Sequence, residues 1–418
     1  MNSIFNQLLN VKNVVVEDVR IVDSPLRPEP VLEIRVRPRK GTLRCSRCGR
    51  RRRGYDQGGG VRRWRHQDFG CFRVELVAAM PRVDCPKCGV VVAMVPWAKP
   101  GSRFTRDFEA ECAWLMGVAN QKTVSGFLHV AWRTAGDIAR RVAGRLKASM
   151  PSPFDGLHAI GVDETSHRKG HTYLTVVVDH ERHRVIWAHD GVGGDVFDLF
   201  FKALTPEQRA SIKVVTGDGA RWIDSCVGRW CPNAERVLDG FHIVSWMTGA
   251  LDKVRKRLWN QARHAGDEKT TKRMRGAKYA VLKNPDQLTE RQNETLAALR
   301  NTDPKGQLYR AWQLKELLRT LLRHPLEQAR GELKHWVFWA SHSRIPEIVE
   351  LAKKIRRRRP DILRTIELGY SNARLEAFNN RIKVTIRMAY GFHHVNNLIA
   401  LVMLRCGGLD IRLPQPRT

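Results

Sequence analysis

Two short cysteine pairs constrain the N-terminal part of this chain more than any other feature of its sequence. The pairs are Cys45 with Cys48 and Cys85 with Cys88, and each is followed at once by a glycine that permits a tight turn. Four thiolates on two such knuckles match the closed tetrahedral coordination of a structural Zn²⁺ ion. The 36 residues between the pairs carry enough strand pattern to bring the knuckles together. We therefore predict a zinc ribbon, and we disfavour a redox CxxC site because the pairs are matched and lack a thioredoxin-like context.

The other cysteines, and a histidine between the pairs, are predicted to lie outside the metal site. His66 stands in the stretch RRWRHQDFG and could be a ligand, but four thiolates already saturate the metal. We expect this stretch to form a basic DNA-facing or structural turn. Ordinary packing roles are expected for Cys71, Cys112, Cys226, Cys231 and Cys406.

The charge of the chain favours a polyanionic partner. Its 73 Lys and Arg residues outnumber 42 Asp and Glu, which gives a formal charge of +31 over 418 residues. Double-stranded DNA is the first candidate, because cationic side chains release counterions from phosphates. No apolar run approaches the roughly 18 residues of a membrane span, and the N-terminus lacks the pattern of a signal peptide. We expect a cytoplasmic, nucleoid-associated protein with no membrane partner.

Strand pattern, helical pattern and prolines divide the chain into three expected domains. Residues 1–100 alternate at period two, as expected of short strands in a zinc-ribbon DNA-binding domain. Residues 101–150 have helical periodicity and end before Pro151. Residues 151–418 have the pattern of an α/β domain that a charged helical insertion interrupts at about 250–365. The expected fold class is therefore α+β and multidomain.

The helical segment after the ribbon has the pattern of a DNA-reading motif. Three helices are expected from Phe104 onward, with a tight turn near Val130 between the second and the third. The third helix carries Arg133, Arg140 and Arg141, which fits the helix of a helix-turn-helix that enters the major groove. A plain three-helix bundle with a solvated arginine face is the alternative.

Two aspartates follow apolar strands in the third domain. The strand HAIGVD ends in Asp163, and the strand KVVTGD ends in Asp218. A carboxylate buried at such a position is costly unless it pairs or binds metal. A later helix, SNARLEAFNNRIK, supplies Glu376, and the three carboxylates together could hold two divalent ions about 4 Å apart. Mg²⁺ or Mn²⁺ suits such an all-oxygen site.

The order of elements around these residues is that of an RNase H-like domain. A strand, a hairpin, a helix, a strand, a helix, a strand and a late helix follow one another, and the strand ends that carry the two aspartates are then neighbours. The sequence also resembles the ISL3 family of bacterial insertion-sequence transposases. The matching pieces occur in family order and cover most of the chain: the CxxCG and CPxCG knuckles, RRWRHQDFG, IGVDE, VVTGDGA, LDGFH and SNARLEAFNNRIKVTIRMAYGF.

The resemblance implies a DDE-type transposase with an RNase H-like catalytic domain. Such an enzyme binds the terminal inverted repeats of its own element, cleaves DNA and joins the 3' ends to target DNA, and we expect it to act as a homo-oligomer. By position, Asp163, Asp218 and Glu376 take the three catalytic roles and bind Mg²⁺. The 157 residues between the second and third carboxylates correspond to a helical insertion that is common in such enzymes.

Further residues are expected to support this site. Asp239 and His242 match a D-x-x-H signature found in several transposase families, although a core His–Asp hydrogen bond is nearly as good an explanation. Asn380 and Lys383 lie one and two turns past Glu376 on its helix, where Lys383 could contact a phosphate or form a solvated surface charge.

Two other functions stay open at this point. A domesticated DNA-binding regulator would keep the ribbon and the helix-turn-helix without catalysis, but all three carboxylates are intact. An RNase H-fold nuclease or resolvase would act on structured nucleic acid, whereas the N-terminal domains favour a defined DNA end.

Salt dependence tests the interpretation of the charge. We predict that binding to any DNA duplex weakens steeply as salt increases, because phosphate contacts release counterions. Preference for the ends of the element should depend on the segment before Pro151. Fluorescence anisotropy with matched and unrelated duplexes at several salt concentrations measures both effects. Equal binding of all duplexes by that segment would place the specificity elsewhere.

Overall fold

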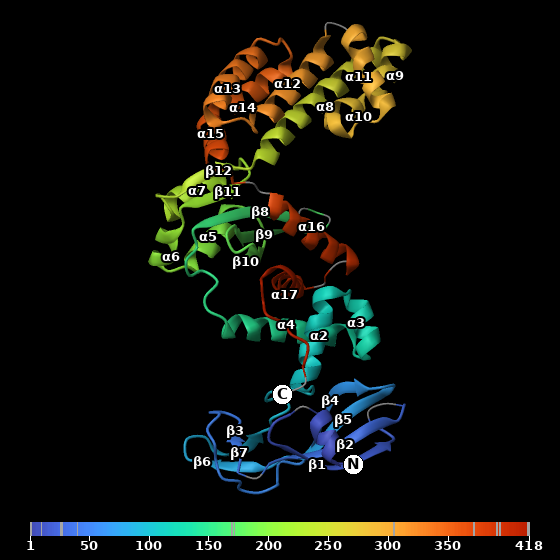
Figure 1. The fold of residues 1–418 in the computed structure, drawn as a ribbon, viewed down its shortest axis with the longest axis vertical. Helices are drawn as coiled ribbons and strands as arrows, with labels where there is room; N and C mark the ends of the chain where they lie inside the picture. The colour runs from blue at the N-terminus through green and yellow to red at the C-terminus, as the bar shows by residue number, and fades with distance from the viewer. Residues whose placement is uncertain are drawn as a thin grey trace. The chain divides into compact units, whose positions relative to one another are not determined.

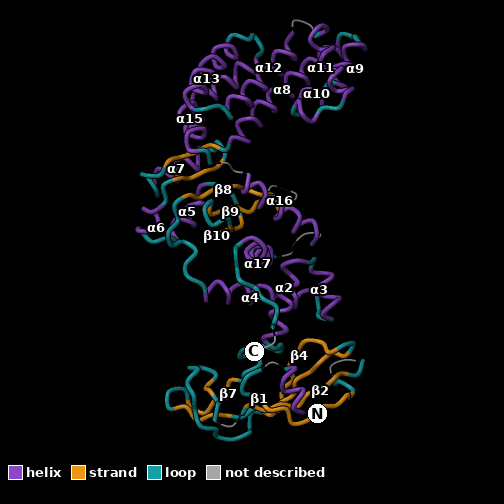
Figure 2. The backbone as a smooth tube through the Cα atoms, viewed as in Figure 1, coloured by secondary structure: helices purple, strands orange, loops and turns teal. Residues whose placement is uncertain are grey.

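The computed structural model divides the chain into two compact units (Figure 1, Figure 2). One unit comprises Met1–Pro153 together with Ile382–Thr418, and the other comprises Phe154–Arg381. The structure describes residues 2–415 except positions 10, 26–27, 40, 169, 171, 304–305, 371–372, 390–391 and 393.

The first unit begins with a four-stranded sheet of order β1-β2-β5-β4, in which only the central pair β2 and β5 is parallel. Apolar side chains from these strands bury one face of the sheet. Under this face the rings of Trp64 and Trp97 meet edge to face, with their centroids 5.4 Å apart. The elements are α1 (Asn2–Leu8), β1 (Val14–Val22), β2 (Val31–Pro38), β4 (Val61–Phe69) and β5 (Phe72–Ala79).

A second, three-stranded sheet carries the cysteine pairs. Its order is β3-β7-β6, and both pairings are antiparallel. The glycines after the two pairs, Gly49 and Gly89, adopt φ values of 70° and 73°, which explains why glycine stands there. The predicted zinc-ribbon fold is confirmed. Its strands are β3 (Arg44–Cys45), β6 (Arg82–Cys85) and β7 (Gly89–Met94).

The stretch RRWRHQDFG is part of strand β4, so the turn expected there is wrong. Arg65 and His66 are buried, and Nδ1 of His66 lies 2.9 Å from Oγ1 of Thr105, the residue whose side chain caps the next helix. Burial lowers the pKa of His66 to about 4, so its ring is neutral. The stretch therefore fastens the helices to the sheet. Arginine and histidine hid its strand pattern, because a sequence pattern counts them as polar and therefore exposed, although both are buried here.

Four helices complete the first unit. The three expected ones are α2 (Arg106–Val118), α3 (Gln121–Leu128) and α4 (Trp132–Ser149), and His129 forms the tight turn between α3 and α4 in the left-handed conformation, with φ 54°. A fourth helix, α17 (Val395–Cys406), packs against α2 and α4 (Figure 1). Most of its residues are buried, and a helix that is apolar on most sides gives no amphipathic period. The sequence pattern therefore does not predict this helix.

The second unit is built on a five-stranded sheet of order β10-β9-β8-β11-β12. β11 lies parallel to both β8 and β12, whereas β9 is antiparallel to β8 and β10. This is the order expected of an RNase H-like domain, and the predicted hairpin is β9 with β10. The strands are β8 (Ala159–Arg168), β9 (Thr172–Asp179), β10 (Arg184–Asp190), β11 (Val214–Gly217) and β12 (Glu235–Leu238). The accompanying helices are α5 (Gly194–Lys202), α6 (Pro206–Ser211) and α7 (Arg221–Trp230).

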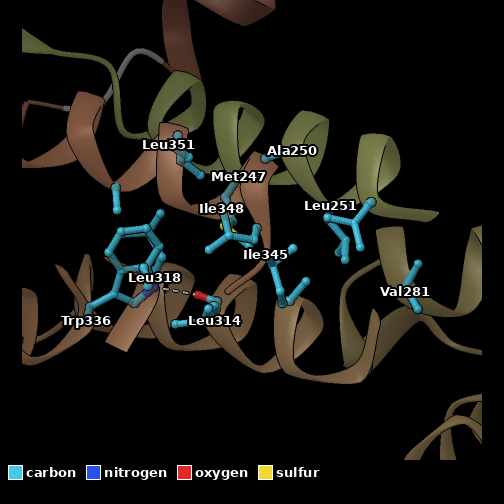
Figure 3. Packing of buried hydrophobic residues seen from close by; sticks show 14 of the residues in the cluster. Met247, Ala250, Leu251, Val281, Leu314, Leu318, Trp336, Ile345, Ile348 and Leu351 are labelled. Carbon is cyan, nitrogen blue, oxygen red and sulfur yellow. Dashed lines mark hydrogen bonds between the residues drawn. The ribbon is translucent and has the colours of Figure 1, made fainter. Parts of the chain in front are cut away.

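A large helical region follows β12 in the sequence. Its helices enclose an apolar core in which Trp336 donates its indole N–H to the carbonyl oxygen of Leu314 at 2.8 Å (Figure 3). The indole donor of Trp336, which is almost completely buried, is thus paired. The helices are α8 (Gly240–His264), α9 (Glu268–Gly276), α10 (Lys278–Leu282), α11 (Glu290–Thr302), α12 (Gln307–Leu321), α13 (Leu326–Ser341), α14 (Pro346–Arg357) and α15 (Arg359–Leu368).

The helix α16 (Ala373–Met388) carries Glu376 and crosses the division between the units, which falls after Arg381. Ser371 and Asn372, where this helix was expected to begin, lie outside the described residues. No helix in the part of the chain that the structure describes combines the length and the apolar character needed to cross a membrane.

Arg405 of α17 tests the role of this helix in the first unit. Its guanidinium donates to the carbonyl oxygens of Met116 at 3.0 Å and Ala119 at 2.7 Å, at the end of α2, and to Oγ1 of Thr385 at 2.9 Å. We predict that Arg405→Ala lowers the free energy of unfolding by about 2–3 kcal/mol, because it leaves partly buried carbonyls without donors. Denaturant unfolding of the full chain measures this loss. Arg412→Ala, which removes a surface arginine, is the control and should change little.

Candidate active site and zinc centre

The four paired cysteines form a compact sulfur cluster in the first unit. Their Sγ atoms all lie within 4.8 Å of one another, and those of Cys48 and Cys85 are 3.6 Å apart. Zinc–sulfur bonds of about 2.3 Å in a tetrahedron require sulfur–sulfur distances of about 3.8 Å. The donor set therefore fits one structural Zn²⁺ ion. Cys112, Cys226, Cys231 and Cys406 are buried as expected, whereas Cys71 is exposed.

The ionisation of these thiols also fits a cation among them. Nε of Arg52 donates to Sγ of Cys85 at 3.4 Å, and this hydrogen bond lowers the pKa of Cys85 to about 6. Burial, with the neighbouring thiols, raises the pKa of Cys88 to about 12. Four thiolates this close repel one another, so a divalent ion is needed to keep all four ionised together.

The arginines predicted to read DNA stand on α4 in different surroundings. Arg133 is exposed in the first turn of the helix. Arg140 is exposed and pairs with Asp137 at 3.0 Å. Arg141 pairs at 2.9 Å with Glu109, whose carboxylate is buried, so this arginine also stabilises the packing of α4 on α2. Their contact with DNA stays a prediction.

Three aspartates in the second unit come to one level of the sheet. β11 pairs in parallel with β8 on one side and β12 on the other. When this register is continued by one or two residues, Asp163, Asp218 and Asp239 lie side by side at the carboxyl ends of the paired segments. The strand does not end at Asp163 as expected, because β8 continues beside β9 to Arg168. Asp163 marks the end of the parallel pairing instead.

The carboxylate of Asp163 is held by an asparagine that the sequence analysis did not select. Burial raises the pKa of Asp163, and the charge of Asp218 acts in the same direction. Nδ2 of Asn379 donates to Oδ2 of Asp163, and its Oδ1 accepts a hydrogen bond of 2.7 Å from Oγ1 of Thr165. Counting one turn as four residues from Glu376 selects Asn380, whereas the buried contact is three residues away. The signal available in the sequence was a polar residue close to the apolar side of the helical pattern, where a buried polar group needs a hydrogen-bond partner.

The loop that carries Asp218 is fixed by a buried arginine. Oδ1 of Asp218 accepts from the backbone N–H of Ala220 at 2.9 Å. Arg236 of β12 donates to the carbonyl oxygens of Val215 and Gly217 at 3.4 Å each, and also to that of Asp218. Burial lowers the pKa of Arg236, a cost that these acceptors offset. The backbone around Asp218 is therefore held from within the sheet.

Asp239 and His242 lie together at the start of α8. Oδ1 of Asp239 caps the helix by accepting from the N–H of Phe241 at 3.0 Å, and its Oδ2 lies 3.7 Å from Nε2 of His242. The electrostatic influence of His242 reaches Asp163 and lowers the pKa of that carboxyl. Asp239 and His242 therefore lie near Asp163 and Asp218. The capping of α8 is by itself enough to explain why an aspartate stands at position 239.

Glu376 does not join the two aspartates in a compact cluster. Its side chain is exposed on α16, and among the described residues only the four cysteines form a potential metal-binding group within 4.8 Å. Glu376 lies one helical turn before Asn379, which contacts Asp163, so both stand on one side of the helix. Lys383 is exposed further along α16. Glu164 accepts a hydrogen bond of 2.9 Å from the N–H of Gly193.

Comparison with known families gives three matches along the chain. Residues 42–88 match the zinc-finger of the transposases of IS204, IS1001, IS1096 and IS1165, and residues 93–143 match the helix-turn-helix domain of transposase family ISL3. Residues 160–402, more than half of the chain, match the ISL3 family described as transposase. The zinc ribbon, the helix-turn-helix and the α/β sheet with its aspartates thus define a DNA transposase.

Comparison with individual proteins gives the same result over almost the whole length. The chain is 40% identical to the transposase for insertion sequence element IS1557 of Mycobacterium tuberculosis, over 98% of this chain and 97% of that protein. It is 28% identical to the transposase for insertion sequence element IS1001 of Bordetella parapertussis, over 90% of this chain and 91% of that protein. This chain belongs to the ISL3 family of insertion-sequence transposases. The family favours transposition over the regulator and nuclease alternatives.

Zinc content tests the sulfur cluster. We predict that the purified chain contains about one Zn²⁺, and that Cys85→Ser loses both the metal and sequence-specific binding to element ends, because the knuckles separate without it. Cys71→Ser removes an exposed cysteine outside the cluster and should keep both. Metal analysis and gel-shift titration measure the two properties. Full zinc content in Cys85→Ser would contradict the assignment.

Proposed function

We propose that this transposase is of the DDE type, with Asp163, Asp218 and Glu376 as its catalytic carboxylates. It would bind the terminal inverted repeats of its own element, cleave DNA there and join the 3' ends to target DNA. One observation carries the proposal: Asp163 and Asp218 stand at one level on neighbouring parallel strands, where burial raises the pKa of Asp163 and the charge of Asp218 adds to this effect. Burial of charged carboxylates side by side costs free energy unless a partner or a bound cation offsets it, so we connect this pair with metal binding.

The donor set at these positions fits Mg²⁺. Carboxylate oxygens are its preferred protein ligands, and burial raises the pKa of Asp163 until a cation offsets that cost. A bound Mg²⁺ pair would supply activation of the attacking oxygen and stabilisation of the leaving oxygen. Asp163 and Asp218 would hold the ions from the sheet. Glu376 would complete the set from α16 once its exposed side chain turns toward Asp163.

The surrounding side chains keep the carboxylates in place. Asn379 orients Oδ2 of Asp163 and is itself held by Thr165. Glu376 precedes Asn379 by three residues, a rise of about 4.5 Å along a helix. Because Asn379 contacts β8, Glu376 is brought near the part of the sheet that carries Asp163. His242 and Asp239 would support this site from the start of α8.

The other parts of the chain would supply DNA recognition. In this scheme residues 1–100 form a zinc-ribbon domain, residues 101–150 a helix-turn-helix, and residues 151–418 the catalytic domain with an insertion at about 250–365. Arg133 and Arg140 are exposed on α4, as groove or phosphate contacts must be. Lys383 would contact a phosphate from α16. Joining two element ends would bring two or more copies of the chain together in one complex.

Charge-removing substitutions test the catalytic assignment. Asp163→Asn, Asp218→Asn and Glu376→Gln keep the side-chain shape but remove the charge that two-metal chemistry needs. We predict that each lowers Mg²⁺-dependent cleavage and joining by at least about a thousandfold, or about 4 kcal/mol of barrier. End binding should persist in gel-shift titrations, because it uses other domains.

The matched control is Glu181→Gln, which changes a surface glutamate that pairs with His158 at 3.1 Å. It should retain most activity. Supercoiled DNA that carries the element's ends, incubated with each variant, reports nicking and joining. Joining at a near wild-type rate by Asp218→Asn or Glu376→Gln would overturn the assignment.

A further inference from the structure

A cavity between α8 and α14 lies next to the loop that carries Asp218. Its volume is about 660 Å³, a size typical of small-ligand sites, and its lining includes Trp246, Lys253 and Lys354. Ala250 and Leu351, labelled in Figure 3 on these two helices, form part of its apolar wall. The ring of Trp246 packs so closely on Gly219 that a Cβ there would lie 2.5 Å from Cζ2 of the indole. The cavity is therefore contiguous with the residue after Asp218.

Lys354 stands where this cavity meets the candidate active site. Its Nζ lies 3.5 Å from the centre of the Trp246 ring, in a cation–π contact. Burial lowers the pKa of Lys354, while the negative charge of Asp218 acts in the opposite direction. This ammonium group is thus within electrostatic reach of a proposed catalytic carboxylate.

The charges in the lining leave the cavity positive. Its two glutamates are both neutralised by arginine or lysine: Glu347 pairs with Arg257 at 2.8 Å, and Glu350 pairs with Lys353 at 2.6 Å. Neither Lys253 nor Lys354 pairs with a carboxylate in the described part of the chain. Two unpaired ammonium groups beside an aromatic face match a nucleotide, which combines an anionic phosphate with flat and apolar parts.

The position of Lys354 relative to the Asp218 loop is fixed by Arg358, one turn further along the chain. Nη2 of Arg358 donates to the carbonyl oxygen of Gly219 at 3.1 Å and to Oδ2 of Asp224 at 2.5 Å. Asp224 also accepts from Nε of Arg236 at 3.1 Å. The end of α14 is therefore tied to the loop by ionic hydrogen bonds, and Lys354 keeps its place beside Asp218.

We propose that the α8–α14 cavity binds one nucleotide of the DNA strand beside the scissile phosphate, with Lys354 on its phosphate and Trp246 against its sugar or base. The inference rests on the proposed DDE function, because it needs Asp218 to mark the place of cleavage. Lys354 then binds the DNA directly: the end of α14 stays fixed by Arg358, while the side chain of Lys354 turns from the indole face to the phosphate. A charge-assisted bond to phosphate replaces a weaker cation–π contact, and the indole face becomes free for the nucleotide.

Single-phosphate neutralisation in the DNA tests this site. The substrates are duplexes with one element end and one methylphosphonate, placed at successive positions on either side of the cleavage site. The proteins are the full-length wild type, Lys354→Ala and Lys354→Arg, with Lys272→Ala as the control, a surface lysine of α9 outside the cavity lining. Cleavage in Mg²⁺ is measured beside a gel-shift titration and a thermal melt for each variant.

We expect one methylphosphonate within a few nucleotides of the cleavage site to slow the wild type about 10- to 100-fold. Lys354→Ala should slow cleavage of unmodified DNA by a similar factor, and that methylphosphonate should add little to it, because both changes remove the same contact. Lys354→Arg should restore most of the rate. Lys272→Ala should cleave like wild type, and end binding should stay within about threefold in all variants.

Two outcomes would overturn the proposal. One is cleavage by Lys354→Ala at the wild-type rate. The other is a Lys354→Ala variant that cleaves slowly and that every methylphosphonate slows further by as much as it slows the wild type. The lysine would then act through the fold and not through a phosphate. A wild-type chain that binds element ends but does not cut them would instead overturn the proposed function, and this inference with it.

Discussion

The burial of Asp163 next to a second carboxylate, Asp218, is the constraint on which the candidate site in the second unit depends. Neighbouring parallel strands bring the two carboxylates to one level, and burial of Asp163 adds a cost that only a partner or a cation can offset. The structure offsets this cost by fixing the backbone near the carboxylates and by placing neutral or cationic side chains next to them. Arg236 binds the carbonyl oxygens around the Asp218 loop, and Asn379 donates to Asp163. These contacts thus fix the two carboxylates at the carboxyl ends of the paired strands.

The helical region explains how a residue so far along the chain reaches this edge. After β12 the chain enters α8 and builds a core of its own before α15 returns to the sheet. There Oγ1 of Thr365 donates to the carbonyl oxygen of Leu238 at 2.9 Å, at the end of β12. From that fixed point α16 places Asn379 on Asp163. Both ends of the helical region are therefore attached to β12, through α8 and α15. The length of the region consequently has little effect on the position of α16.

Local patterns predicted most of the fold, and tertiary packing accounts for the rest. Alternation and helical periodicity predicted the succession of strands and helices along the second unit, and the cysteine spacing predicted the ribbon. β4 was missed because Arg65 and His66 are buried polar residues whose partners lie in the next helix. The contact of Asn379 with Asp163 joins residues 216 positions apart, which no local pattern contains. In the candidate site, sequence alone could select Asp163 and Asp218 but could not tell which face of α16 meets them.

The balance of charge around the candidate site decides whether DNA can approach it. Bare carboxylates would repel a phosphate, since like charges this close are separated by little water. The ammonium group of Lys354 lies within electrostatic reach of Asp218, so a positive group stands on the side of α14. The chain as a whole carries +31 and attracts DNA at long range, but that attraction is screened within about 10 Å in salt. Close to the carboxylates only local cations can act. The helical region that interrupts the α/β domain supplies them, which gives a physical reason for an insertion at this point of the chain.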